Sequence, residues 1–591
     1  MKMKSFGISL ASFLMAMYIY LLTGIDENEL FPVLVGMFVV LGIHFKLKSE
    51  NRVVTIVSLV LACYITFSFY FGHQSWKINS EGFLTWKNIL ISLAGVPYMW
   101  LSFINLGDWW KKLSIAEGID DHDSENVIKR RIEKSLWPLI MVGMVICWIP
   151  ALVFNYPAII ISDYTWQYSQ ALGESLLSNH HPIIHTGLIK FSQWICKLIF
   201  GTVMAEYSVF INSVIQMIIL AGIIAYIIAR LWKEAGNKYV RLLVILAGAW
   251  YAFFPMNALF SIYMTKDVIF SALVLLWSFL LIKDFKADNP NKIQFISEIV
   301  VAILVMLFRS NGFFIVFGTL IVLIPVNRKC KSLRVMFLLL LMVFMAQNPI
   351  LNIMNAQKTE IVESIGMPIN QIANIVKKDE ILSDNEREDI EAVISLESIK
   401  ENYNVRYSDQ IKFNPDFNAS VIENNKGRYL KLWVQLFLKY PVDCLEASLN
   451  LTIGYWYPGV DKGCISYDYD TRNSFYEQLG IQNYSTNELY RHFISADVRK
   501  NMMEAWLWSP GFAVLIMLVM LFLCISQETY GLIKMFVPGI FGGMSLLIAT
   551  PSYCETRYIY FVFLLIPVWV VNLFIAKKNK SDKLIASEIR G

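Results

Sequence analysis

The segment IIHTGLIKFSQWICKLIF, residues 183–200, decides how the rest of this chain is arranged. It is apolar enough to be considered as a membrane-spanning helix, yet it carries Lys190 and Lys197. If this segment crossed a membrane, every later loop would change sides. The basic residues of those loops therefore decide the fold.

Composition places the chain in the membrane class before any motif is considered. Of its 591 residues, 56% are hydrophobic and 17% are charged, against about a quarter charged in soluble domains. Apolar runs long enough to cross a hydrocarbon core predict an all-α polytopic protein with about 14 transmembrane helices. Their centres fall near residues 14, 38, 62, 97, 147, 219, 249, 276, 300, 319, 341, 519, 541 and 567.

Basic residues set the orientation of these helices, because cytoplasmic loops are enriched in Lys and Arg. With both termini in the cytoplasm, the inner loops and tails hold 28 Lys and Arg, and the short outer loops hold 7. Crossing by residues 183–200 would invert this bias. We therefore predict that the segment is a helix on the outer surface, in a multi-pass protein of the cell membrane.

The same pattern divides the chain into parts. We predict four transmembrane helices in 1–110, a cytoplasmic charged linker in 111–136, a transmembrane core in 137–348 with an outer loop at 157–206, an outward, mostly helical insertion in 349–510, three transmembrane helices in 511–576 and a cytoplasmic tail in 577–591. The eight scattered cysteines imply no disulfide framework. The net charge of +4 gives no argument for a nucleic-acid partner, because the basic residues follow the topology.

Polar residues that are scarce elsewhere gather in the predicted outer loops. The stretch SDYTWQYSQALGESLLSNHHPIIHTG, residues 162–187, holds three of the seven histidines. Further ionisable residues mark three other outer helix ends, in SIYMTKDVIF, LFRSNGFF and ATPSYCETRYIYF. The candidate site residues of these four segments are Asp163, Gln167, Glu174, His180, His181, His185, Lys266, Asp267, Arg309, Glu555 and Arg557.

Each of these residues also has a structural explanation. A single Lys or Arg at a helix end can extend its charge to the interface. Asp163 could be a helix N-cap, His181 could cap a helix that starts at Pro182, and Asp267 could cap the helix after it. However, ionisable groups near a bilayer are costly and tend to mark functional sites, and here they gather at one membrane face.

A zinc site is the first alternative for the histidines. His181 and His185 are four residues apart and share a helix face, but the neighbouring His180 cannot easily join them. No HExxH pattern and no nearby cysteine pair complete a ligand set. We therefore predict no metal and no cofactor.

These residues resemble motifs of the GT-C superfamily of membrane glycosyltransferases. The Asp and HHP in one outer loop, TKD, RSNG and a near-terminal ETRY are similar to the bacterial branches built like protein O-mannosyltransferases and lipid A aminoarabinose transferases. The resemblance covers roughly residues 137–576. It implies transfer of a sugar from a polyprenyl-phosphate-linked donor to a cell-envelope glycan, lipid or protein acceptor at the outer face of the membrane.

The resemblance also implies roles for individual residues. Asp163 matches the position of the catalytic base, which would activate the acceptor for an inverting attack. Lys266, Arg309 and Arg557 would stabilise the leaving lipid phosphate. The remaining assignments stay open: His180 or His181 would hold the acceptor or contact the phosphate, Glu174 or Asp267 would be a second acid, and Gln167, His185 and Glu555 would line the substrate site.

Other function classes remain as alternatives. A transporter or lipid flippase would place ionisable residues near the middle of the bilayer and often has two similar halves, which this sequence lacks. A lipid-linked glycan polymerase or ligase is a near neighbour in chemistry. A non-catalytic membrane scaffold is the third alternative.

Overall fold

The computed structural model describes residues 2–23, 51–78, 80–113, 127–178, 181–284, 292–326, 331–357, 360–460, 469–484, 508–550 and 552–589. Within these ranges the chain is helical, with isolated backbone bridges and no extended strand. The predicted all-α class is therefore confirmed for the part of the chain that the structure describes.

The helices before the insertion fall into two groups. The N-terminal group comprises α1 (Lys2–Thr23), α3 (Arg52–His73), the π-helix η1 (Gln74–Ile78), α4 (Trp86–Ala94) and α5 (Val96–Lys112). The core group comprises α6 (Val127–Phe154), α7 (Ser162–Leu172), α8 (Ile183–Phe200), α9 (Ala205–Glu234), α10 (Lys238–Phe253), α11 (Pro255–Ser261), α12 (Lys266–Asp284), α13 (Lys292–Phe308), α14 (Asn311–Val326) and α15 (Lys331–Ile353).

The insertion and the C-terminal group complete the fold. The insertion contains η2 (Ile361–Ser364), α16 (Gly366–Lys377), α17 (Asp384–Glu391), α18 (Leu396–Asn402), α19 (Asp409–Lys412), α20 (Ala419–Asn424), α21 (Lys426–Lys439), α22 (Pro441–Leu451), α23 (Ile453–Trp456) and α24 (Tyr469–Gln478). The C-terminal group contains α28 (Pro510–Ser526), η3 (Tyr530–Met535), α29 (Val537–Ile548) and α30 (Thr556–Ile589).

Six helices among the described residues are long and apolar enough to cross a membrane, or seven if the bent pair α10–α11 is one span. Four shorter apolar helices accompany them. A multi-pass membrane protein is supported, whereas the count of about 14 spans is not confirmed. The span predicted near residue 38 lies outside the described residues.

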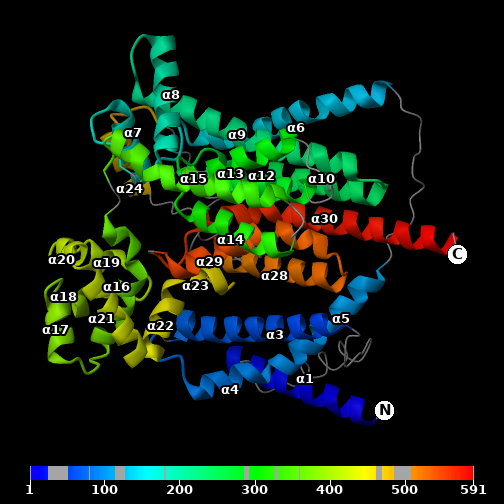
Figure 1. Cartoon of the computed structure of the whole chain (residues 1–591), viewed down its shortest axis with the longest axis horizontal. Helices are drawn as coiled ribbons and strands as arrows, with labels where there is room; N and C mark the ends of the chain where they lie inside the picture. Colours follow the sequence, from blue (N-terminus) through cyan, green and yellow to red (C-terminus); the bar gives the residue numbers. More distant parts are fainter. Residues whose placement is uncertain are drawn as a thin grey trace.

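The long helices run side by side and the two ends of the bundle differ (Figure 1). Both chain termini lie at one end, and the insertion, α7 and α24 lie at the other. Helix α8 runs across the direction of the long helices at this second end and is not among the candidate spans of the described residues. This placement suits the predicted surface helix, while its position relative to a membrane stays a prediction.

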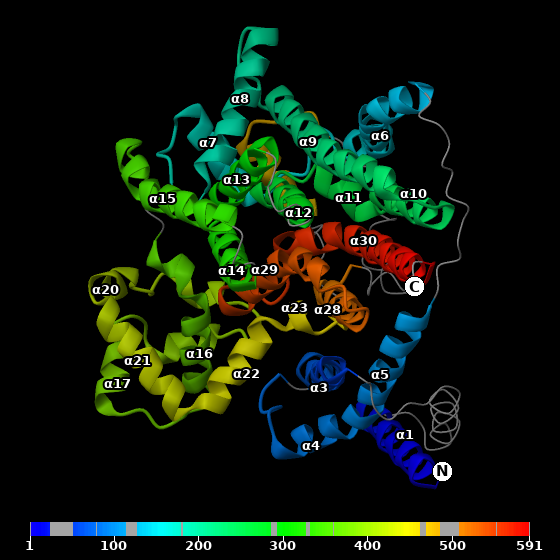
Figure 2. The same ribbon diagram turned by 45° about the vertical axis from the view of Figure 1, so that its right-hand side comes forward.

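Two central helices carry the fold, α12 and α30. Helix α12 carries apolar residues on all of its faces. Because such a helix has no face suited to water, it is stable when other helices enclose it. It packs against α9, α13 and α30, and its side chains from Val268 to Ile282 are buried with few exceptions (Figure 2). Because α12 and α30 both begin at the end that carries the insertion, their first residues meet there.

The N-terminal group packs on the C-terminal group through α3, which contacts α5 and α28. The Ser68 hydroxyl of α3 donates to the carbonyl oxygen of Trp456 at 2.5 Å, and the Tyr64 hydroxyl donates to the same oxygen at 3.1 Å.

The predicted fourth span is a pair of helices, α4 and α5, that meet at Gly95. A Cβ at Gly95 would lie 2.8 Å from the Thr66 side chain, so the close packing there depends on glycine.

The insertion has its own hydrophobic core, formed mainly by Ile and Val side chains of α16 to α21. A capping box of Ser383 and Glu386 begins α17, as its sequence SDNE favours.

Two predicted boundaries differ from the structure. Helix α15 continues past residue 349 to Ile353, and α30 continues through the predicted tail to Ile589.

Candidate functional site

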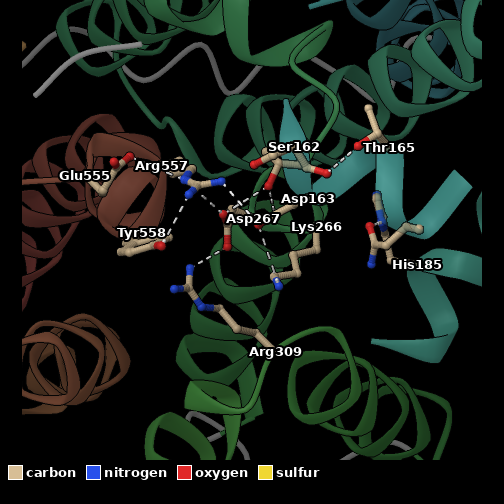
Figure 3. A network of polar contacts seen from close by, with 12 residues as sticks. Ser162, Asp163, Thr165, His185, Lys266, Asp267, Arg309, Glu555, Arg557 and Tyr558 are labelled. Carbon is tan, nitrogen blue, oxygen red and sulfur yellow. Dashed lines mark hydrogen bonds and ion pairs between the residues drawn. The ribbon is translucent and has the colours of Figure 1, made fainter. Parts of the chain in front are cut away.

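The site lies where helices α7, α12 and α30 begin and where the chain turns between α13 and α14. Asp163 is in the first turn of α7, Lys266 and Asp267 open α12, and Arg557 is in the first turn of α30. Arg309 lies in the break between α13 and α14. Figure 3 shows these five side chains pointing toward one another from different helices. The four outer segments predicted to share one face therefore meet in space.

Backbone pairing brings Asp163 and Lys266 together. The Ile159 amide donates to the carbonyl oxygen of Ile262 at 2.9 Å, and the Met264 amide donates to that of Ile159 at 2.9 Å. The Gln216 side-chain amide of α9 donates to the Tyr263 carbonyl at 2.8 Å. These bonds hold the segments that precede α7 and α12 side by side, so the first turns of both helices face the same space.

The glycine of the RSNG motif allows the chain to turn tightly between α13 and α14. Helix α13 ends at Phe308 and α14 begins at Asn311, so the chain reverses at Arg309. A Cβ at Gly312 would lie 2.1 Å from the carbonyl oxygen of Val305. Only glycine allows this close approach, and the tight reversal directs Arg309 toward α12.

Asp163 contacts two cations through one oxygen atom. Its Oδ2 lies 3.4 Å from Nη1 of Arg557 and 4.0 Å from Nζ of Lys266. The Asp163 side chain keeps 29% of its exposure, whereas that of Lys266 keeps 12%. A carboxylate that solvent can reach is therefore placed beside two largely buried positive charges.

Asp267 lies deeper and pairs with two arginines. Its Oδ1 accepts a hydrogen bond from Nη1 of Arg309, and its Oδ2 lies 3.8 Å from Nε of Arg557. The Thr265 hydroxyl donates to Oδ2 at 3.0 Å. The Asp267 side chain is only 1% exposed, and a buried charge of this kind is stable when it is paired and hydrogen-bonded. Asp267 is thus an ion-pair partner of two arginines, and because α12 begins at Lys266, it lies inside the first turn rather than at the N-cap position.

Tyr558 joins both arginines and was not among the predicted residues. Its ring lies under the guanidinium carbons of Arg309 and Arg557, at 4.1 and 4.9 Å from the ring centre. Such cation–π contacts orient a guanidinium without neutralising it. The sequence signal was present, because Tyr558 follows Arg557 directly in ETRYIYF, but the partner Arg309 is distant in sequence.

Glu555 lies at the edge of the same group. Its Oε2 is 3.3 Å from Nε of Arg557, and its backbone amide donates to the Tyr455 hydroxyl oxygen at 3.0 Å. Burial raises the pKa of Glu555 and outweighs the opposite effect of the Arg557 charge, while the nearby Asp267 and Asp163 raise the pKa further. The protonated form of Glu555 is therefore more accessible than that of an isolated glutamate.

Helices α7 and α8 are joined by a buried contact between a histidine and a glutamine. The Nδ1 atom of His185 and the Oε1 atom of Gln167 are 2.7 Å apart, and both side chains are only 1% exposed. Burial lowers the pKa of His185 to about 4, and the Lys266 charge acts in the same direction. His185 is therefore neutral at physiological pH and positions α8 against α7.

The remaining predicted residues have different outcomes. Glu174 lies exposed in the turn after α7 and has no contact with the ion-pair cluster in the described structure. His181 is buried at the start of α8, and His180 lies outside the described residues. Neither predicted cap is observed, because Ile161 is the N-cap of α7 and Pro182 that of α8.

No group of three or more metal-ligating side chains occurs among the residues that the structure describes. What the site offers is charge: the carboxylates of Asp163, Asp267 and Glu555 alternate with the cations Lys266, Arg309 and Arg557 (Figure 3). Such a set can bind an anionic group through its cations and can accept a proton at a carboxylate that solvent reaches.

A family model for a family of unknown function (DUF6020) matches residues 156–586, more than half of the chain. Comparison with curated proteins and with solved structures gives no match. The matched region includes every residue of the ion-pair cluster and excludes the N-terminal helices. On this match, the chain belongs to the DUF6020 family.

Proposed function

We propose that the protein is a membrane glycosyltransferase that moves a sugar from a polyprenyl-phosphate-linked donor to a cell-envelope acceptor at the outer face of the membrane. The observation that carries the proposal is the placement of Asp163 against Lys266 and Arg557 at the end of the bundle that holds the insertion. A carboxylate and two cations at one point supply the base and the phosphate partners that this reaction needs.

The proposed reaction is a single displacement. The acceptor hydroxyl attacks the anomeric carbon, its proton passes to the Asp163 carboxylate, and the bond between the anomeric carbon and the phosphate oxygen breaks. The electron pair of that bond leaves with the lipid phosphate. Lys266, Arg309 and Arg557 stabilise the added negative charge, because all three are largely buried and the two arginines are already oriented by Asp267 and Tyr558.

A transporter is less well supported by the same geometry. Transport sites in membrane proteins commonly lie near the middle of the bilayer between broken helices. Here the ionisable side chains occupy the starts of α7, α12 and α30, and the centre of α12 is apolar.

The test combines the purified protein with a panel of radiolabelled polyprenyl-phosphate sugars and a cell-envelope acceptor fraction. We expect transfer of one sugar by the wild type, reduced by about 10²–10⁴-fold in Asp163→Asn, which keeps the side-chain shape but cannot act as a base. Glu174→Gln is the matched control, because it removes an exposed carboxylate away from the cluster.

Thermal unfolding of both variants in detergent separates catalysis from folding. We expect unfolding temperatures near the wild-type value. Full transfer by a folded Asp163→Asn protein would show that the base assignment is wrong, and absence of transfer by the wild type with every donor would contradict the proposed function.

A further inference from the structure

Asp163 uses the same cations that the proposed function gives to the donor phosphate. Its Oδ2 atom faces Arg557 and Lys266 at 3.4 and 4.0 Å. A phosphate oxygen bound by these two cations would occupy the space that Oδ2 now fills. Two anions cannot share these partners without repulsion, so a phosphate and the Asp163 carboxylate compete for them.

The second aspartate takes no part in this competition. Asp267 is 1% exposed, and it accepts hydrogen bonds from Arg309 and from the Thr265 hydroxyl. Asp163 is 29% exposed and lies at longer distances from its cations. Asp267 therefore keeps the arginines in place. Glu555 is 39% exposed and lies 3.3 Å from Nε of Arg557, but Asp163 is the carboxylate whose contacts join Arg557 and Lys266, so it is the one that an anion bound by both cations would replace.

We propose that Asp163 occupies the position of the donor phosphate until the donor binds and is then released. This inference rests on the proposed function. Arg557 and Lys266 turn from the carboxylate to the phosphate, and Asp163 is then free to accept a hydrogen bond from the acceptor hydroxyl. The donor consequently binds before the acceptor, and the base is engaged only when a sugar is present.

Replacement of an ordinary binding residue weakens ligand binding, whereas replacement of Asp163 is expected to strengthen the binding of lipid phosphate. Asp163→Asn removes the competing charge and keeps the shape of the side chain. We expect it to bind polyprenyl phosphate at least about fivefold more tightly than the wild type, because the two cations no longer have an anionic partner at this position. The same variant loses transfer activity under the proposed function.

The measurement is equilibrium binding of fluorescent polyprenyl phosphate to the full-length protein in detergent micelles. Glu174→Gln, which also removes one negative charge, is the control and should bind as the wild type does. Thermal unfolding confirms that each variant is folded, and Asp163→Ser, smaller and equally uncharged, serves as a second variant.

The outcomes separate the inference from the proposed function. Tighter binding by both Asp163 variants, with no change in Glu174→Gln, supports the exchange. Unchanged or weaker binding by the folded Asp163 variants, while the wild type binds, overturns the exchange but leaves lipid-phosphate binding intact. No binding of polyprenyl phosphate by the wild type overturns both.

Discussion

Asp163 and Asp267 lie in the first turns of their helices, where a negative charge is favoured by the helix dipole, but their surroundings differ. Asp163 remains accessible at the edge of the cluster, whereas Asp267 is enclosed by Arg309 and Thr265. Equal residue types at equal helical positions thus acquire different roles. The local sequence indicated both as acids of the site, while their burial depends on helices distant in sequence.

Loss of Asp267 should affect stability more than any other change in the cluster. Asp267→Ala leaves Arg309 as a buried charge without its carboxylate, at a cost of about 3–5 kcal/mol. We expect a clearly lower temperature of thermal unfolding in detergent. In the double variant Asp267→Ala/Arg309→Met, much of this loss should be recovered. If the double variant is no more stable than the single one, the ion pair is not the source of the effect.

The buried contact between His185 and Gln167 predicts that the stability of the folded protein depends on pH. The folded protein holds the pKa of His185 at about 4, below its ordinary value of about 6.5. Above about pH 6.5 the residue is neutral in both states and contributes nothing to the pH dependence. As the pH falls from about 6.5 to 4, protonation favours the unfolded chain and stability decreases by about 3 kcal/mol.

The measurement for His185 is thermal unfolding in detergent across this pH range. His185→Asn retains a hydrogen-bonding partner for Gln167 but does not titrate. Its unfolding temperature should fall less than that of the wild type on acidification. Parallel curves for the two proteins would show that His185 is not the titrating group.

Among the elements, the loop before α30 connects the site to the insertion. The Tyr553 amide donates to the carbonyl oxygen of Arg406 at 3.0 Å, and Tyr407 and Ser552 form an antiparallel bridge. The Arg406 guanidinium donates to the carbonyl oxygens of Ser75 at 2.6 Å and Asn450 at 3.1 Å. One arginine therefore joins η1, α22 and the loop that leads to Arg557.

Removal of Arg406 should loosen the insertion from the bundle. Arg406→Ala removes the charged hydrogen bonds to buried oxygen atoms of Ser75 and Asn450, and such bonds contribute about 1.5–3 kcal/mol each. We expect faster cleavage within residues 360–460 under limited proteolysis. Arg428→Ala is the matched control, because the Arg428 side chain is 60% exposed and its ion pair with Asp389 lies within the insertion. Equal cleavage of the two variants would contradict the proposed connection.

Helix periodicity and motifs predicted the elements better than the contacts between them. The quoted stretches located the starts of α7, α12 and α30 and the α13–α14 turn, because charged residues next to apolar runs are a local signal. The contact of Tyr558 with Arg309 and the pairing of Ile159 with Tyr263 join positions distant in sequence. A single sequence has no local feature that records such pairs, so these could not be predicted.

At the scale of the whole molecule, the two ends of the bundle carry different parts of the chain. The termini lie at one end, and the insertion and the ion-pair cluster lie at the other (Figure 1). The predicted topology places the first end in the cytoplasm. Hydropathy detected the apolar runs but not how many helices they form, because broken helices such as α10–α11 look like single spans in sequence.

Cysteine accessibility tests the predicted topology. In a background without native cysteines, we expect Lys238→Cys, at the exposed start of α10, to react with a membrane-impermeant maleimide only after the cells are opened. Lys197→Cys, on the exposed side of α8, should react in intact cells because residues 183–200 lie on the outer surface. Labelling of Lys238→Cys from outside would contradict the orientation and the surface position of α8.

The insertion is attached to the bundle on both flanks of the site. The Gln357 amide donates to the carbonyl oxygen of Leu177, next to the bridge of Gln357 with Ser178, and Tyr407 pairs with Ser552 on the opposite flank. The first attachment holds the turn after α7 and the second holds the loop before α30. The insertion is consequently not an exchangeable module. A chimera that carries a foreign domain in place of residues 357–460 would need to rebuild both edges, and so this domain and the helices that bear the cluster are expected to be inherited as one unit.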